Sequence, residues 1–182
     1  MIGRRLALVL LLVSAVAFAD DAVWIPDAGL RAAVAGALGV DAEAPIPVQQ
    51  MLQLRELRAR SSAVADLTGL EAARNLAELD LRENPDIINL EPLRGLTQLH
   101  YLNLNLNNGI RSIRPLSELS ELNVLLLRGV RVLHRPEERA VLVRLGPLDR
   151  LNVRDTGLTS VAALLPGLDA GGYREQLDLR EN

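Results

Sequence analysis

The sequence predicts an α/β solenoid that is curved, with a parallel β-sheet on its concave face and a helical cap at its N-terminal end. Three observations predict this class. A leucine spacing recurs from Leu54 onward at intervals of 22 to 26 residues. Hydrophobic residues make up 49% of the chain but aromatic residues only 2%, so aliphatic side chains have to fill the core. A segment with helical periodicity and both helix-end signals precedes the first repeat.

Residues 1–19 have the three parts of a secretory signal peptide in the usual order. Arg4 and Arg5 supply the positive start, Leu6 to Val16 is an apolar run, and Ala17-Phe18-Ala19 is a cleavage signal. A retained membrane anchor is the alternative, but the run is shorter than the roughly 20 residues that span a bilayer. We therefore expect cleavage and export, to the periplasm or out of the cell, with no membrane segment left afterwards.

Charge and cysteine content exclude several function classes. The net charge is −3, and removal of the leader with its two arginines lowers it to −5. A mildly acidic chain lacks the basic footprint that nucleic-acid binding needs, so we expect no nucleic-acid partner. The chain has no Cys, which excludes disulfides, thiol catalysis, cysteine metal sites and a cysteine lipid anchor.

Residues 20–53 are predicted to form the helical N-terminal cap. Asp27 is a good helix N-cap and Gly39 a natural residue after the helix end. Val48 to Gln53 offers a second short helical turn. A solenoid needs such a cap because its first coil would otherwise expose an apolar end. The residues expected on the apolar face of the first helix are Leu30, Val34, Ala37 and Leu38.

Trp24 and Ile25 stand just upstream of this helix. We expect Trp24 to fold back and pack in the core. The alternative is an exposed tryptophan that serves as a platform for a ligand.

Residues 54–182 follow the pattern L-x-x-L-x-L-x-x-N-x-I, which is the signature of leucine-rich repeats. We expect five full units and a partial sixth. The units start at Leu54, Leu76, Leu99, Leu122, Leu148 and Arg174. The fourth and sixth positions point to the same side of a short strand and are predicted to form the core. Asn at the ninth position turns the chain, and its amide satisfies backbone groups that no strand pairing reaches.

The fourth unit departs from the pattern. Val130 replaces the ninth-position Asn, so we expect the ladder to be weakest there. Pro136-Glu137-Glu138 followed by Arg139 to Leu145 and then Gly146 predicts a helix on the convex side. Earlier units are expected to have only short turns at that place.

Three stretches, IPDAGLRAAVAGALG, MLQLRELRARSSAVADLTGLE and LAELDLRENPDIINLEPLRGLTQLHYLNL, resemble the internalin-like class of bacterial leucine-rich-repeat proteins. The resemblance covers residues 20–182. It implies a helical N-terminal cap, a right-handed curved solenoid, a parallel sheet on the concave face, and recognition of a protein or surface as the usual role. The motif residues of this class are scaffold residues, so the resemblance carries over no catalytic position.

The last unit resembles the second but has no cap after it. Leu177 to Asn182 repeats Leu79 to Asn84 as LDLREN, and nothing follows. We expect a fragment of a longer chain or a truncated reading frame. The alternative is an open last strand, and an open edge invites pairing with another chain.

Binding by such a solenoid is expected at the third, fifth and seventh positions of each strand. Five of the six seventh positions are Arg. One interpretation is a solvated ladder of ion pairs with neighbouring acids. The other is an anion-recognition stripe, since Arg holds carboxylates bidentately. Tyr101, Val124 and Leu126 are expected to add a small apolar patch. The candidate binding residues are Arg60, Arg82, Tyr101, Asn103, Asn105, Val124, Leu126, Arg128, Asn152, Arg154 and Arg180.

No motif points to catalysis, a metal or a cofactor. His100 and His134 are the only histidines, and neither has a second His or Cys at metal-ligand spacing. The expected function is therefore a non-enzymatic module that binds a protein or surface polymer with its concave face, in the cell envelope or outside the cell. The alternatives are a structural spacer or self-associating element, possibly part of a larger surface protein, and an enzyme that acts on a glycan through the acid-rich face.

Overall fold

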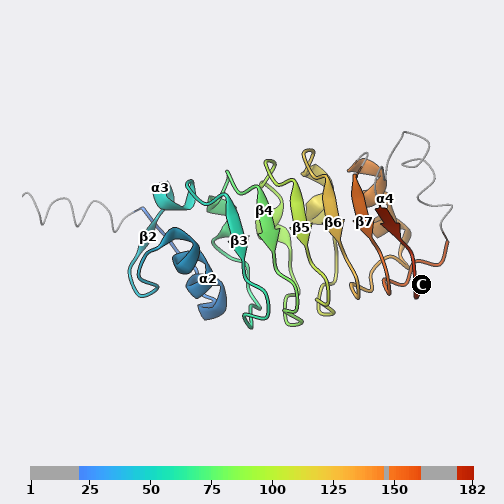
Figure 1. Cartoon of the computed structure of the whole chain (residues 1–182), viewed down its shortest axis with the longest axis horizontal. Coiled ribbons are helices and arrows are strands. Elements are labelled where there is room, and N and C mark those ends of the chain that lie inside the picture. The colour runs from blue at the N-terminus through green and yellow to red at the C-terminus, as the bar shows by residue number, and fades with distance from the viewer. Residues whose placement is uncertain (1–20, 146–147, 161–175) are drawn as a thin grey trace, which may run out of the picture.

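The computed structural model describes residues 21–145, 148–160 and 176–182, and the predicted signal peptide lies outside these ranges. Six strands form one parallel sheet in the order of the chain, so each coil lies beside the next (Figure 1). This arrangement confirms the leucine-rich-repeat solenoid. The strands are β3 (Glu56–Arg58), β4 (Glu78–Asp80), β5 (Tyr101–Asn103), β6 (Val124–Leu126), β7 (Arg150–Asn152) and β8 (Gln176–Asp178).

The sheet is in register at its leucines. The fourth-position residues face one another across all five strand pairs: Leu57, Leu79, Leu102, Leu125, Leu151 and Leu177. The first five of them are completely buried, as are the sixth-position residues Ala59, Leu81, Leu104, Leu127 and Val153. Burying one such leucine contributes about 1.5–3 kcal/mol. The period of two along each strand therefore builds one continuous apolar stack.

A row of helices forms the other side of the solenoid. Three short 3₁₀ helices, η1 (Leu70–Ala72), η2 (Glu91–Leu93) and η3 (Arg114–Glu118), pack side by side, and α4 (Pro136–Arg144) packs next to η3. The predicted helix of the fourth unit is thus confirmed. Glu137 lies in its first turn, where an acid interacts favourably with the helix dipole.

A buried carboxylate attaches α4 to the preceding unit. The side chain of Glu138 is 1% exposed. Its oxygens accept hydrogen bonds from Ser112 Oγ at 2.9 Å and from the Ile113 backbone N–H at 2.7 Å. Arg114 Nε and an Arg135 guanidinium nitrogen lie 3.7 and 3.8 Å from it. A buried acid is tolerated here because hydrogen bonds and cations surround it.

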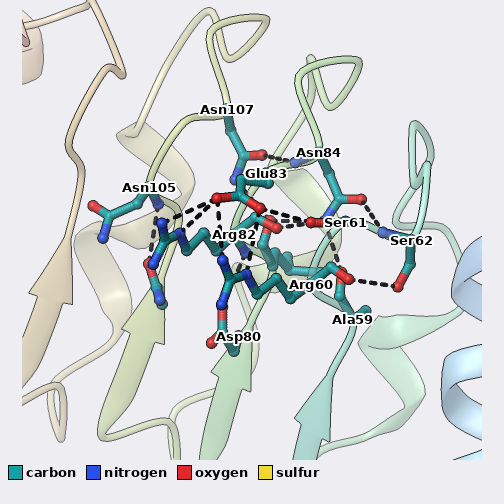
Figure 2. A network of polar contacts seen from close by, with 12 residues as sticks. Ala59, Arg60, Ser61, Ser62, Asp80, Arg82, Glu83, Asn84, Asn105 and Asn107 are labelled. Atoms are coloured by element: carbon teal, nitrogen blue, oxygen red, sulfur yellow. Dashed lines mark hydrogen bonds and ion pairs between the residues drawn. The ribbon is translucent and has the colours of Figure 1, made fainter.

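The second and third coils each close on a buried ninth-position amide, Asn84 and Asn107 (Figure 2). Asn84 Oδ1 accepts from the N–H groups of Ser62 and Val64 in the preceding coil at 3.1 and 3.0 Å. Its Nδ2 donates to the carbonyls of Ala59 and Leu81 at 2.7 and 2.8 Å. One side chain therefore satisfies backbone groups of two successive coils, as expected from the motif. Asn182 makes the corresponding contacts around Val153 and Leu158.

The residue before each ninth position has a left-handed backbone. Its φ is positive in all six units: Ser61, Glu83, Leu106, Gly129, Asp155 and Glu181. A non-glycine residue pays about 1–2 kcal/mol for this conformation. Only the fourth unit, whose ninth residue Val130 has no polar side chain, has glycine there, with φ of 80°. Gly129 therefore removes the steric cost of the left-handed backbone in the fourth coil, where the side chain of Val130 cannot form a hydrogen bond.

The sequence predicts the weakest ladder in the fourth unit, but this unit lacks only the side-chain hydrogen bonds of the ninth-position amide. Val130 is fully buried and has no polar side-chain atom. The backbone pairing continues on both sides of β6, where Leu125 faces Leu102 and Leu151. The Gly129 N–H still donates to the Arg154 carbonyl at 3.0 Å.

The N-terminal segment forms the expected helices. α2 (Ala28–Leu38) begins after Asp27, whose Oδ1 accepts from the Leu30 N–H at 2.8 Å, and α3 (Val48–Met51) follows. The other oxygen of Asp27 accepts from the N–H groups of Ala65 and Asp66 in the first repeat. Partial burial raises the pKa of Asp27, but these backbone N–H groups outweigh it and hold the pKa below its usual value. A two-stranded antiparallel pair, β1 (Ala22–Val23) and β2 (Ile46–Pro47), lies beside them.

Two expectations for this segment are wrong. Trp24 is 72% exposed, whereas Ile25 is buried. Side chains alternate along extended backbone, so only one of two adjacent residues can face the core, and Ile25 takes that side. On α2, Ala35 is buried instead of Ala37. Ala37 is exposed because it lines an open hollow beside the exposed side chains of Glu56 and Arg58, whereas the buried side chain of their strand is Leu57.

Within the described ranges, no helix is long and apolar enough to cross a membrane.

Replacing Asn84 with Leu is expected to lower the free energy of unfolding by about 3 kcal/mol. The substitution removes the hydrogen-bond partner of four backbone groups, and a buried polar group without a partner costs about 1–3 kcal/mol. Urea unfolding followed by circular dichroism measures the change. The exposed Asn108→Ala is the control, and we expect it to stay within about 0.5 kcal/mol of the wild type. Equal stability of the two variants would contradict the role given to the amide.

Replacing Glu138 with Ala is expected to destabilise the protein by about 3 kcal/mol, since the Ile113 N–H and Ser112 hydroxyl lose a charged acceptor in the interior. Glu137→Ala, at the neighbouring exposed acid, is the matched control. Hydrogen exchange should rise across α4 and η3 in the first variant only. Unchanged protection of η3 in Glu138→Ala would show that the carboxylate does not join the two units.

Candidate functional site

The register of the sheet places the candidate binding residues in rows across the concave face. Neighbouring strands lie about 4.8 Å apart. Tyr101, Val124 and Arg150 therefore stand side by side at the third positions of β5, β6 and β7. The next row contains Asn103, Leu126 and Asn152. Asn105, Arg128 and Arg154 follow at the seventh positions of the same three units.

The first two seventh-position arginines share one acid (Figure 2). Arg60 Nε lies 3.3 Å from Glu83, and an Arg82 guanidinium nitrogen lies 3.0 Å from it. Ser61 Oγ also donates to Glu83 at 2.7 Å. The hydrogen bond from Ser61, followed by that from Arg60, holds the pKa of Glu83 below its usual value. Both arginines are thus already engaged with one acid of the protein, which neutralises one of their two charges.

The last two seventh-position arginines are paired as well. Arg154 Nε donates to Glu181 at 2.7 Å, and Arg180 lies 2.8 Å from Asp178. The hydrogen bond from Arg180 is the main reason that the pKa of Asp178 falls to about 2. For these four arginines the ladder of ion pairs is the better interpretation, and each such exposed pair contributes about 0–1 kcal/mol.

Arg128 differs from the other four. Its backbone N–H donates to Asn105 Oδ1 at 2.8 Å. Among the described residues, no carboxylate lies within ion-pair distance of its guanidinium. Arg150, one strand further along, also has no such partner in this part of the chain. In the described residues, Arg128 and Arg150 are therefore two cations of this part of the face without a short ion pair, and Arg150 lies beside Val124.

The apolar patch at the centre is smaller than expected. Tyr101 and Val124 are half-buried and accessible, but Leu126 is only 6% exposed. Leu126 stands between the side chains of Asn103 and Asn152 in its row, and these limit its contact with solvent. Asn103 is equally buried. The accessible part of the patch is thus Tyr101 with Val124.

A hollow of about 460 Å³ lies at the other end of the same face. Its charged and aromatic lining consists of Glu56, Arg58, Arg60, Glu78, Asp80 and Tyr101. The three acids are not among the residues predicted for the site. The signal for them was their place in the third and fifth columns of the first two units. It was missed because the sequence shows which charges are near one another, but not which of them pair.

The described residues contain no group of three or more His, Asp or Glu side chains arranged to hold a metal ion. His100 Nε2 lies 3.6 Å from Glu78. His134 is exposed and precedes α4.

No protein-family model and no curated protein matches the chain. Solved structures do match it. An internalin (inlF) from Listeria monocytogenes is 21% identical, with a TM-score of 0.57 over 80% of this chain and 48% of that one. An internalin C2 (inlC2) from the same organism is 22% identical, with a TM-score of 0.51 over 78% of this chain and 70% of that one. This chain spans about half the length of the first protein. The internalin-like leucine-rich-repeat fold is thereby confirmed.

The Glu83 network predicts a specific pH dependence. Because the pKa of Glu83 is lowered by folding, its contribution is complete above its ordinary value of 4.5 and is lost as the pH falls through the lower folded value. Glu83→Gln should be less stable than the wild type near about pH 6, and the gap should close near about pH 3. Urea midpoints at both pH values measure it. The exposed Glu121→Gln is the control, and a gap that stays constant with pH would contradict this assignment.

Proposed function

We propose that this internalin-like solenoid is a non-enzymatic module that binds a protein or surface ligand with its concave face. Its site of action is proposed to be the cell envelope or the outside of the cell, on the basis of the leader sequence. The observation that carries the proposal is the cluster of Arg128, Arg150, Tyr101 and Val124, in which the arginines have no acid partner among the described residues.

The composition of this cluster supports binding. Residues that contribute most to protein interfaces are enriched in Tyr and Arg and surround a desolvated centre. Tyr101 and Val124 supply such a centre; Arg150 lies beside Val124, and Arg128 follows on the same unit beyond Leu126. The other seventh-position arginines are engaged within the protein, so these two are available to a ligand without breaking an existing ion pair.

The backbone beneath the cluster supports binding as well. β5, β6 and β7 are joined in register, and the leucines beneath them are completely buried. Side chains on such a sheet keep their spacing when a ligand arrives. A preorganised surface loses less conformational entropy on binding, which favours affinity.

Self-association through the last strand is the alternative function. The edge of a sheet has unpaired N–H and C=O groups that can pair with another chain. Self-association of this kind would use the edge of the strand and leave the side chains of the concave face free, so it can be distinguished from the proposed function.

The absence of cysteine allows a direct test of the concave face. Val124→Cys, coupled to polyethylene glycol, blocks the centre of the face, and Arg111→Cys on the opposite side is the matched control. We expect peptides selected from a random phage-displayed library on the wild-type protein to lose at least about tenfold in affinity, about 1.4 kcal/mol, on the first conjugate only.

Equal binding to the two conjugates would place the ligand elsewhere and reject the proposed function. Light scattering of the unmodified protein accompanies the test. A mass that rises with concentration and is unchanged by the block at position 124 would favour association through the strand edge instead.

A further inference from the structure

We propose that the concave face is bipolar and takes a segment of a partner protein with a basic and an acidic side chain close together. The basic group would lie over Glu78 and Asp80, and the acidic group over Arg128 and Arg150. The inference rests on the proposed function and adds the charge pattern of the partner.

The acidic half of the face, Glu78 and Asp80, is available to a partner because Arg82 forms its ion pair with Glu83 and not with Asp80. The hexapeptide LDLREN occurs twice, and in its second copy Arg180 pairs with Asp178. In the first copy Arg82 pairs with Glu83 instead. In the described part of the chain, Asp80 therefore keeps only the hydrogen bond from the Arg82 backbone N–H at 3.0 Å. Its carboxylate has no cation partner among the described residues.

Glu78, two residues earlier on β4, has a similar environment. Among the described residues, the only side chain within ion-pair distance of it is His100, with Nε2 at 3.6 Å, which is charged only when protonated, and the Glu78 side chain is 47% exposed. The arginines nearby are already engaged, because Arg58 pairs with Glu56 and Arg60 with Glu83. Glu78 and Asp80 thus form the negative side of the 460 Å³ hollow.

The basic half contains no acid on its binding face. The third, fifth and seventh positions of the third, fourth and fifth units are Tyr101, Asn103, Asn105, Val124, Leu126, Arg128, Arg150, Asn152 and Arg154. Of the three arginines, only Arg154 has a carboxylate partner in the described residues. An acidic group on a partner would therefore meet two guanidinium groups, of Arg128 and Arg150, that form no short ion pair with the described residues.

Tyr101 lies between the two halves. Burial raises the pKa of its hydroxyl, the carboxylates of Asp80 and Glu78 raise it further, and Arg150 opposes them. The phenol thus experiences both charged regions at once. A tyrosine in this position offers a partner an aromatic surface between its two charged contacts.

The spacing limits the partner. β4 is two strands from β6 and three from β7, which corresponds to about 10–14 Å. An extended chain rises about 3.3 Å per residue and its side chains alternate, so a segment lying across the strands would place its basic and acidic residues about four positions apart on one side. The hollow beside Asp80 offers room for the basic side chain.

Charge complementarity favours this partner over a wholly acidic one. An acidic segment along the face would meet Glu78 and Asp80, and like charges brought together disfavour the wrong partner. A second copy of the chain, turned end to end, would also match the charges. Two concave faces, however, touch only at their rims, so a narrower segment fits better.

The test selects peptides from one random phage-displayed library on the wild-type protein, on Asp80→Arg and on Arg128→Glu, and reads their charges by sequencing. We expect peptides with both a basic and an acidic residue to be enriched about tenfold on the wild type. Asp80→Arg should shift the enrichment to acidic peptides, and Arg128→Glu should shift it to basic ones. Asp80→Asn and Arg128→Gln, which change less, should shift it in the same directions. Arg111→Glu, on the opposite side, is the control.

Two results would overturn the inference while leaving the concave binding function intact. The first is a pool selected on the wild type in which acidic peptides dominate. The second is that all variants select the same peptides as the wild type, while polyethylene glycol at position 124 still abolishes binding. Loss of dependence on that block would reject the proposed function itself. A wild-type dimer that Asp80→Arg breaks, and that adding Arg128→Glu restores, would make a second copy the occupant and overturn the foreign segment.

Discussion

The buried amide at the end of a regular coil constrains the structure around it. Asn84 satisfies N–H and C=O groups of its own coil and of the one before it, so a strand can end and the chain can turn inside an apolar stack. The turn requires a left-handed residue immediately before the amide. The position before that residue is the seventh, so the same turn determines where the arginines of the concave face stand.

The fourth unit shows what the fold needs when this amide is missing. Val130 leaves the turn without the side-chain hydrogen bonds of an amide, and glycine at the preceding position removes the steric cost of the left-handed backbone. On the other side of the same unit, α4 is longer than the 3₁₀ helices before it, and Glu138 binds it to the previous coil. The pairing of β6 with both neighbours is complete. The irregular unit is therefore supported from its convex side.

Ion pairing decides which part of the concave face is open to a partner. Glu83 holds two arginines, Glu181 holds another, and each pair removes charge that the sequence displays. Among the described residues, the charges without an arginine–carboxylate pair are unevenly distributed, with Glu78 and Asp80 on β4 and with Arg128 after β6 and Arg150 on β7. The internalin-like fold supplies the platform, while this remainder distinguishes the chain from a generic solenoid. The proposed partner is inferred from the charged side chains that are not paired within the protein, and not from the total number of charges in the sequence.

The periodicity of the sequence determined the solenoid, the number of units, the buried leucine stack, the cap helix with its ends at Asp27 and Gly39, and the helix from Pro136. These follow from local rules, because the direction of a side chain along a strand or helix repeats with a short period. Tertiary structure alone decided that Trp24 is exposed, that Ala35 replaces Ala37 in the core, and that Leu126 is covered. It also decided that Arg82 pairs with Glu83 whereas Arg180, in an identical hexapeptide, pairs with its own aspartate. Such outcomes depend on competition among groups that lie more than twenty residues apart in the chain and about 5 Å apart in space.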